Sequence, residues 1–284
     1  MILVDMNQVT LSNLMIQIGR SDEVDPDMVR HMVLNSLRGY RNRFCEEYGE
    51  LVLCYDNKGN WRREYFPNYK HGRRKDRKAS KLDWGSIFDT LHLIKQELQD
   101  NFPYKVLEVE NVEADDIIAS VVSYVAESPS HYEKVLILSG DKDFIQLQKH
   151  SFVTQYSPVL KKFVNGIDPD VYIKEHILKG DRSDGVPNFL SPDNCFVNEL
   201  RQRPISKKKL ATWIDLDPED FCNEEMLRNY QRNRTLIDLT QAPDWVSKTC
   251  VEAYLNSKVN DRSGLLNYFI KHRLKNHMEN IGDF

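Results

Sequence analysis

Short apolar runs alternate with amphipathic stretches along the first 160 residues of the chain. The apolar runs predict strands at 2–4, 51–55, 104–109, 134–139 and 152–156. Apolar positions at helical spacing predict helices between them, most clearly near 27–45, near 86–99 and after Glu113. Strands separated by helices are typical of the α/β class, so we expect a mostly parallel central sheet flanked by helices.

The pattern changes after Asp168-Pro169. From there the strand signal fades, and short helical stretches are interrupted by prolines and glycines. A boundary near 160–168 therefore divides the chain into a sheet domain, 1–165, and a smaller helical lobe, 166–284.

Composition limits the functional classes. Of the 284 residues, 40% are hydrophobic and 29% are charged, as in ordinary soluble proteins. No apolar run is long enough to span a membrane and the apolar start is too short for a signal peptide, so we expect a cytoplasmic protein without membrane contact. The five cysteines form no C-x-x-C pair, which favours reduced thiols and argues against a zinc site.

Segment 61–81, WRREYFPNYKHGRRKDRKASK, concentrates positive charge. It holds nine Lys or Arg residues against two acids, although the whole chain carries a net charge of −4. A solvated loop would have such a run, but Trp61, Tyr65, Phe66 and Tyr69 are interleaved with the cations. Aromatic rings among cationic side chains suit nucleic acid, whose backbone is negative and whose bases can stack.

Acidic residues follow four of the predicted strands. They are Asp5, Asp56, the group Glu113, Asp115 and Asp116, and the pair Asp141 and Asp143. A single acid at a strand end is often a turn residue or a helix cap. Because parallel strands end at one edge of a sheet, where the functional crevice of open α/β sheets lies, we expect all seven acids to gather there.

A cluster of carboxylates requires cations. Oxygen-only ligation favours hard ions, Mg²⁺ or Mn²⁺, over zinc. Two such ions that share carboxylates form the arrangement used for in-line displacement at phosphorus. The segment KGDRSDGVP, 179–187, adds Asp181 and Asp184, which either form a turn or lend further ligands to the cluster.

Several motifs occur in a fixed order along the chain. They are the strand-end Asp5, Asp56 before a basic Y-K-x-x-R segment, EADD at 113–116, SGDKD at 139–143 and GDRSD at 180–184. This order resembles the flap endonuclease or structure-specific 5′-nuclease family over nearly the whole chain. LVDMNQ, CYDN with WRRE, and LRNYQRNRTLIDL resemble phage members of the ribonuclease H type. The resemblance implies a PIN-like nuclease domain, a helical arch over about 61–82 and a helix–turn–helix element in the helical lobe.

The resemblance also implies roles for individual residues. The catalytic ion pair would be surrounded by Asp5, Asp56, Asp116 and Asp141. Further metal ligands would be Glu113, Asp115, Asp143, Asp181 and Asp184. Because so many carboxylates repel phosphate, cations must meet the substrate, and Lys70 and Arg73 match the pair that reaches the scissile phosphate. Arg62, Tyr69 and Arg74 would contact the nucleic acid beside them.

The implied enzyme is a 5′→3′ exonuclease and flap endonuclease that uses two Mg²⁺ ions, for which Mn²⁺ can substitute. It would remove RNA primers and adjacent DNA during phage replication and leave 5′-phosphates. The expected substrates are branched or nicked DNA and RNA–DNA hybrids with a free 5′ end, cleaved by a monomer in the bacterial host cytoplasm. Single-strand DNA-binding protein and a sliding clamp are candidate partners.

Two alternatives stay open at this point. A catalytically silent branched-DNA-binding protein could keep the same fold. An aspartyl phosphatase also places an acid after the first strand, but it requires D-x-D, and Asp5 is followed here by Met6 and Asn7. The family's glycine-rich hairpin after GDRSD is replaced by NFLSPDNCF, so we expect no bound potassium and weaker duplex binding there.

Overall fold

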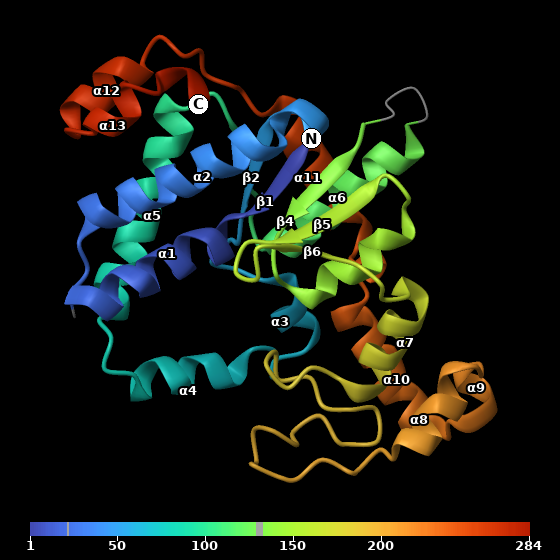
Figure 1. Ribbon diagram of the computed structural model, residues 1–284. Coiled ribbons are helices and arrows are strands. Elements are labelled where there is room, and N and C mark those ends of the chain that lie inside the picture. The colour runs from blue at the N-terminus through green and yellow to red at the C-terminus, as the bar shows by residue number, and fades with distance from the viewer. Residues whose placement is uncertain (22, 129–132) are drawn as a thin grey trace.

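A computed structural model of the chain describes residues 1–21, 23–128 and 133–284 (Figure 1). Its sheet contains β1 (Ile2–Asp5), β2 (Leu51–Tyr55), β3 (Lys105–Glu108), β4 (Val135–Leu138), β5 (Val153–Ser157) and β6 (Lys162–Val164). The helices up to the end of the sheet are α1 (Met6–Ser21), α2 (Pro26–Tyr48), α3 (Trp61–Tyr65), α4 (His71–Ala79), α5 (Trp84–Asn101), α6 (Ala114–Glu127) and the 3-10 helix η1 (Lys142–Lys149). The later helices are α7 (Pro169–Lys179), α8 (Lys207–Ile214), α9 (Pro218–Phe221), α10 (Glu224–Ile237), η2 (Leu239–Gln241), α11 (Asp244–Asn256), α12 (Leu265–Lys271), α13 (Lys275–Met278) and η3 (Ile281–Asp283). Within these described ranges, no helix combines the length and the apolar character that a membrane crossing requires.

The strands lie in the order β3-β2-β1-β4-β5-β6. Neighbouring strands from β3 to β5 run parallel, and β6 pairs antiparallel with β5. The mostly parallel sheet and the five predicted strands are therefore confirmed. The edge strand β6 was not predicted, because its three residues are too few to show a pattern.

β1 is a central strand of the sheet, and the strand order reverses beside it. From β1 the chain adds β2 and β3 on one side, and then β4 and β5 on the other. Ligand crevices of open α/β sheets lie at such a reversal, outside the carboxyl ends of the strands. Asp5 ends β1 and Asp141 follows β4, so both residues stand at the reversal.

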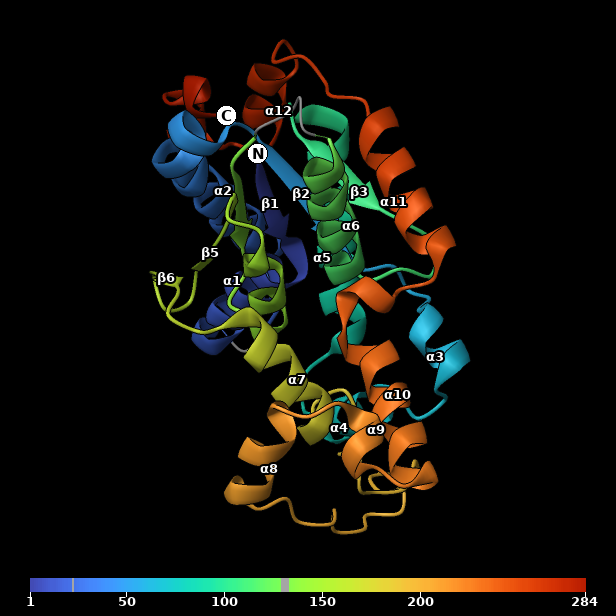
Figure 2. The same ribbon diagram turned by 90° about the vertical axis from the view of Figure 1, so that its right-hand side faces the viewer.

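Helices cover both faces of the sheet (Figures 1 and 2). Ile2 and Val4 of β1 pack with α1, α2 and α5, whereas Leu3 packs with α6 and α11. Alternate residues of a strand point to opposite faces, and both faces are buried here. This explains why the central strands are unbroken apolar runs without polar alternation.

The helix predicted after Glu113 is α6, and the acidic sequence EADD builds its start. Glu113 is the N-cap residue and exchanges capping-box hydrogen bonds with Asp116. The apolar side chains of the following turns, including Ile117 and Val121, are buried in the core between the sheet and α11. The acids at 113–116 are therefore fixed against the core at the functional edge.

The C-terminal residues return to the sheet domain. Val246 of α11 packs into the core shared with α6, and Phe284 joins an aromatic cluster with Phe269. Within the expected lobe 166–284, α7–α10 form a separate cluster with Phe66 and Tyr69 at the base of the arch. Residues 244–284 instead pack into the two cores on either face of the sheet. The sequence of their short helices did not indicate which surface of the sheet domain they would cover.

The basic segment forms α3 and α4, on the side of the sheet where β1 and β4 end (Figure 1). A helical arch over about 61–82 therefore has its expected helical content. The expected helix–turn–helix lacks a compact turn: α7 and α8 contact each other, but the irregular segment 180–206 connects them.

Candidate metal centre and nucleic-acid interface

The carboxylate at the end of β1 is held in place by its neighbours. Ser139 Oγ donates to Asp5 Oδ2 at 2.9 Å, and the backbone N–H of Gln8 donates to Asp5 Oδ1 at 3.2 Å. Ser139 Oγ also accepts from the backbone N–H of Asp141 at 3.0 Å. One hydroxyl therefore links the ends of β1 and β4.

β2 and α6 deliver two further carboxylates to the same edge. The backbone N–H of Ala114 donates to Asp56 Oδ1 at 2.8 Å, which joins the end of β2 to the first turn of α6. The next residue, Asp115, lies within electrostatic range of Asp5, Asp56 and Asp141. The structure thus brings these four predicted site residues together.

Burial and then the crowding of like charges raise the pKa values of Asp5 and Asp115. Burial and then the charge of Asp56 raise the pKa of Asp5 to about 7. Burial and then the charge of Asp141 raise the pKa of Asp115 well above its ordinary 3.8. Two carboxylates about 4 Å apart repel by about 4 kcal/mol at an effective dielectric constant near 20. A divalent cation would relieve this repulsion, as expected of a metal site.

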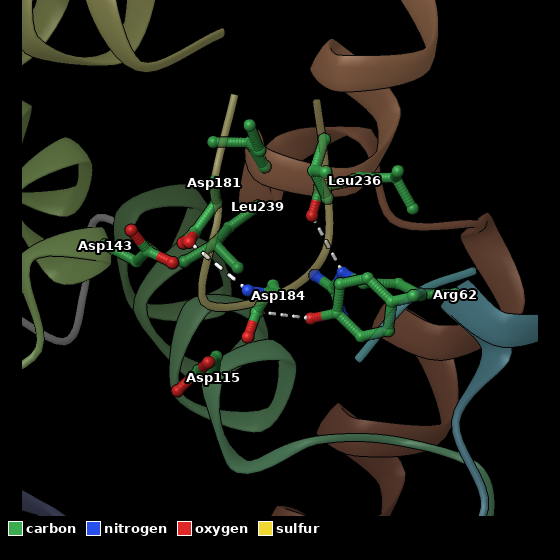
Figure 3. Close-up of a pocket in the computed structure, with 10 residues that line it drawn as sticks. Arg62, Asp115, Asp143, Asp181, Asp184, Leu236 and Leu239 are labelled. Atoms are coloured by element: carbon green, nitrogen blue, oxygen red, sulfur yellow. Dashed lines mark hydrogen bonds between the residues drawn. The ribbon is translucent and has the colours of Figure 1, made fainter. Parts of the chain in front are cut away.

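Asp143, His176 and Asp181 form a second group beside the first. His176 Nε2 lies 3.1 Å from Asp143 Oδ1 and 3.8 Å from Asp181 Oδ2. One ligand atom from each of the three residues lies within 4.8 Å of the other two. Figure 3 shows Asp143 and Asp181 around one pocket with Asp115 and Asp184, so the two groups share a solvent space.

Asp184 ties this region to the base of the arch. The backbone N–H of Lys70 donates to the carbonyl of Asp184 at 2.7 Å, and Arg73 Nη2 lies 2.6 Å from Asp184 Oδ1. Tyr69 Oη lies 2.9 Å from both Asp184 Oδ2 and Glu113 Oε2. Lys70 adopts a left-handed backbone conformation, with φ of 54°, and its ammonium pairs with Glu113. The arch base therefore brings its cations to acids of two other segments.

Glu113 differs from the other acids because cations already neutralise it. Burial raises its pKa, but the charges of Lys70 and Arg62 outweigh burial and lower the pKa to about 2. At Lys70 burial lowers the pKa, and the charge of Glu113 more than compensates, so that the pKa is raised overall. Lys70 thus acts as the counterion of a predicted metal ligand.

The placement of Asp116 corrects the expectation that it surrounds the ion pair. Its side chain is 1% exposed and accepts from Arg62 Nη1 at 2.7 Å, from Arg62 Nη2 at 2.8 Å and from Trp61 Nε1 at 3.0 Å. Both carboxylate oxygens are engaged by α3, so Asp116 fastens α3 to α6. Consecutive helical residues diverge by about 100°, which lets Asp115 face the crevice while Asp116 faces the core.

Arg62 and Tyr69 are also placed differently from the expected nucleic-acid contact. Arg62 is 2% exposed, and its Nε donates to the carbonyl of Leu236 at 2.9 Å. Tyr69 is 4% exposed with its hydroxyl between two acids, so its ring offers no face to a base. These residues form the packed underside of the arch. Arg73 is 44% exposed, whereas the side chain of Arg74 lies outside the described residues.

The donor chemistry of the two groups fits divalent cations. The first group comprises Asp5, Asp56, Glu113, Asp115 and Asp141, and the second comprises Asp143, His176 and Asp181, with Asp184 beside it. Carboxylate oxygens are the ligands that Mg²⁺ and Mn²⁺ prefer. Burial and then neighbouring carboxylates raise the pKa values of Asp5 and Asp115, and a bound cation would offset both effects.

Sequence reasoning missed His176 and the residues that position the site. Gln8 Oε1 accepts from the backbone N–H of Gly140 at 2.5 Å, and Gln155 Nε2 donates to the carbonyl of Asp141 at 2.6 Å. These glutamines act through tertiary contacts and leave no pattern in the sequence. The position of His176, at the end of a helical stretch just before the GDRSD motif, was the available signal for this residue.

Two family descriptions match the chain. The "5'-3' exonuclease, N-terminal resolvase-like domain" matches residues 17–176, and "T4 RNase H, C terminal" matches residues 167–284. The ribonuclease H of Enterobacteria phage T4 is 32% identical over an alignment of 292 positions, which covers 99% of this chain and 95% of that protein. A 5'-3' exonuclease of Buchnera aphidicola is 29% identical over 177 residues, which cover 59% of this chain and 57% of that protein.

Solved structures of bacteriophage T5 enzymes share the fold. The T5 5'-exonuclease with bound zinc matches with a TM-score of 0.57 at 16% identity, covering 91% of this chain and 99% of that chain. The T5 flap endonuclease in a complex with DNA and metal ions matches with a TM-score of 0.56 at 18% identity, covering 89% of this chain and 91% of that chain. The chain therefore belongs to the 5′–3′ exonuclease family and is a metal-dependent 5′-nuclease of the flap endonuclease and ribonuclease H type.

Proposed function

We propose that this nuclease is a Mg²⁺-dependent 5′→3′ exonuclease and flap endonuclease that removes RNA primers and adjacent DNA during phage replication, in the bacterial host cytoplasm. The observation that carries the proposal is the meeting of two carboxylate groups beside the arch cations Lys70 and Arg73. Full-length similarity to the ribonuclease H of phage T4 supports the same class of substrate.

Two groups of side chains would each hold one divalent ion. They are Asp5, Asp56, Glu113, Asp115 and Asp141 for the first ion, and Asp143, Asp181 and Asp184 for the second. When bound, such ions polarise a phosphodiester and lower the pKa of water, which suits in-line displacement with a 5′-phosphate product. Hydrogen bonds from Ser139 and Ala114 keep the first-group carboxylates of Asp5 and Asp56 oriented for this task.

Lys70 and Arg73 would act on the scissile phosphate. In the free enzyme Lys70 is paired with Glu113, and Arg73 is paired with Asp184. With these acids held by a divalent ion instead, Lys70 and Arg73 would both be available to phosphoryl oxygens, and Arg73 could offer two donors at once. Negative charge that develops on the phosphate would then meet groups already in place.

α4 would supply further positive charge along the nucleic-acid backbone. Lys75 and Lys78 are exposed on this helix, and the Arg77 guanidinium lies 5.5 Å from the ring centroid of Trp84. The T5 relative has been solved with DNA. We propose branched or nicked DNA and RNA–DNA hybrids with a free 5′ end as substrates of a monomeric enzyme, and single-strand DNA-binding protein and a sliding clamp as candidate partners.

Cleavage of a 5′-labelled flap and of an RNA–DNA hybrid tests the proposal. The wild-type protein should release 5′-phosphorylated products with Mg²⁺ and none with EDTA. Asp115→Asn should abolish cleavage of both substrates while DNA binding persists. Binding of both substrates without cleavage by the wild-type protein would favour the catalytically silent alternative instead.

A further inference from the structure

His176 lies in the last turn of α7, where two carboxylates from separate segments approach it. Its Nε2 atom lies 3.1 Å from Asp143 Oδ1, at the start of η1, and 3.8 Å from Asp181 Oδ2, in the loop after α7. The imidazole is 17% exposed and therefore mostly enclosed. The family resemblance assigns only carboxylates to this position, so the imidazole nitrogen is an additional donor.

The three donor atoms are spaced like ligands of one ion. An ion with bonds of about 2.1 Å places neighbouring ligands about 3 Å apart and opposite ligands about 4 Å apart. The distances of 3.1 and 3.8 Å from His176 Nε2 fall in this range, and the donor atoms all lie within 4.8 Å of one another. Asp143, His176 and Asp181 therefore lie close enough together to bind a single ion after small adjustments of their side chains.

The backbone around this group is fixed. Gly180 ends α7 with φ of 67°, and a Cβ atom there would lie 2.4 Å from the carbonyl oxygen of Val186. The backbone N–H of Val186 donates to the carbonyl of Asp181 at 2.7 Å, and the ring centroid of Tyr172 lies 5.6 Å from that of His176. The loop thus closes tightly on the helix and keeps Asp181 opposite the imidazole.

We propose that His176 is a nitrogen ligand of the second metal ion and that it shifts the preference of this position from Mg²⁺ toward Mn²⁺. The proposal rests on the proposed function, because it concerns one ion of the same site. Both ions prefer oxygen ligands, but Mg²⁺ keeps much of its water, whereas Mn²⁺, as a first-row transition ion, accepts an imidazole nitrogen more readily than Mg²⁺ does. The first group, which contains only carboxylates, has no such preference for nitrogen-binding ions.

The competing interpretation gives His176 a structural role. As a hydrogen-bond partner of Asp143, it would orient a ligand without touching the ion. The two roles differ in the hyperfine coupling of the ring nitrogen, because only a nitrogen bonded to Mn²⁺ acquires a large isotropic coupling to its unpaired electrons.

Pulsed electron paramagnetic resonance of the Mn²⁺-loaded full-length protein tests direct coordination. The wild-type protein should show nitrogen modulation from imidazole. His176→Gln should lack it, because glutamine keeps a hydrogen-bond donor but has no ring nitrogen. His92→Gln, at an exposed position of α5, is the matched control and should match the wild type. Absence of nitrogen modulation in the wild-type protein would overturn the proposal, even if His176→Gln failed to fold.

Calorimetric titration with each metal alone gives a second readout. The ratio of the Mg²⁺ dissociation constant to the Mn²⁺ dissociation constant should fall about tenfold in His176→Gln and stay unchanged in His92→Gln. An unchanged ratio in folded His176→Gln would refute the proposed selectivity. These readouts do not depend on cleavage, so a protein that coordinates Mn²⁺ through nitrogen but cleaves neither substrate would refute the proposed function alone.

Discussion

Arg62 of α3 donates two hydrogen bonds to Asp116 of α6, at 2.7 and 2.8 Å, in a region closed to solvent. Trp61 adds a third hydrogen bond to the same carboxylate at 3.0 Å. These bonds fasten the base of the arch to the nuclease core. The preceding acid, Asp115, lines a pocket together with Asp143 and Asp181. Two adjacent acids of one motif are therefore placed differently, one paired within the fold and one facing the pocket of carboxylates.

Replacing each acid by asparagine should separate these functions. Asp116→Asn leaves the buried guanidinium of Arg62 without its counterion, and such a loss costs about 3–5 kcal/mol. Asp115→Asn removes one charge from a group that repels itself, so the free energy of unfolding of the metal-free protein should not fall, whereas Mg²⁺ affinity should. Urea denaturation measures the first quantity and calorimetry the second. Weak Mg²⁺ binding by a stable Asp116→Asn protein would contradict this division.

Lys70→Met should tighten Mg²⁺ binding while slowing cleavage. The lysine ammonium competes with a divalent ion for Glu113, so we expect its removal to raise Mg²⁺ affinity about tenfold, equivalent to about 1.4 kcal/mol. Single-turnover cleavage should slow by about 100-fold, since a group that meets developing charge is lost. Lys75→Met, whose cation pairs with Glu199 on the surface, is the control. Equal Mg²⁺ affinity in Lys70→Met and wild type would argue against competition.

The stability of the metal-free enzyme should contain a component that decreases as the pH rises from about 4 to about 7. Burial and the charge of Asp56 raise the pKa of Asp5 from 3.8 to about 7, so the folded state keeps a proton that the unfolded state releases. The resulting stabilisation is fully present below the unfolded pKa and is lost as the pH rises through the folded pKa.

Asp5→Asn tests this component. The variant carries no titrating group at this position, so above about pH 7 its metal-free form should be more stable than wild type by about 1–3 kcal/mol. Thermal unfolding with EDTA across this pH range provides the measurement. Identical pH profiles for the two proteins would show that Asp5 carries no extra proton in the folded state.

DNA binding should depend on salt through the cations of the arch. If about five phosphates are contacted, the logarithm of affinity should fall against the logarithm of salt concentration with a slope near −4. Lys78→Ala, on the exposed side of α4, should make the slope less steep by about 1. Lys134→Ala removes a cation that pairs with Glu47 at the amino end of β4 and should leave the slope unchanged. A flat salt titration would exclude this electrostatic contribution.

The convergence of carboxylates could be predicted because it follows from strand direction. Once the apolar runs before Asp5, Asp56 and Asp141 were recognised as parallel strands, these acids had to meet at one edge. The charge density of 61–81 likewise indicated a nucleic-acid-binding segment, and the family resemblance implied that this segment forms an arch. Each apolar run with its following acid, and the basic run itself, can be recognised from residues that are adjacent in the sequence.

The division of work between Asp115 and Asp116 could not be predicted from sequence. Which of two adjacent helical residues faces the core depends here on Arg62, which lies 54 positions earlier. Long-range pairing also turned Tyr69 inward, although its aromatic and cationic neighbourhood was typical of a nucleic-acid surface. His176 was missed for the same reason, since its partner Asp143 belongs to another segment.

Anomalous diffraction from crystals soaked in Mn²⁺ tests the central claim most directly. We expect two peaks, one bounded by Asp5, Asp56, Asp115 and Asp141, and the other bounded by Asp143, His176 and Asp181. Asp116 should stay hydrogen-bonded to Arg62 and coordinate neither ion. A crystal that shows no ion at the carboxyl ends of β1 and β4, or an ion bound by Asp116, would contradict the metal centre described for this enzyme.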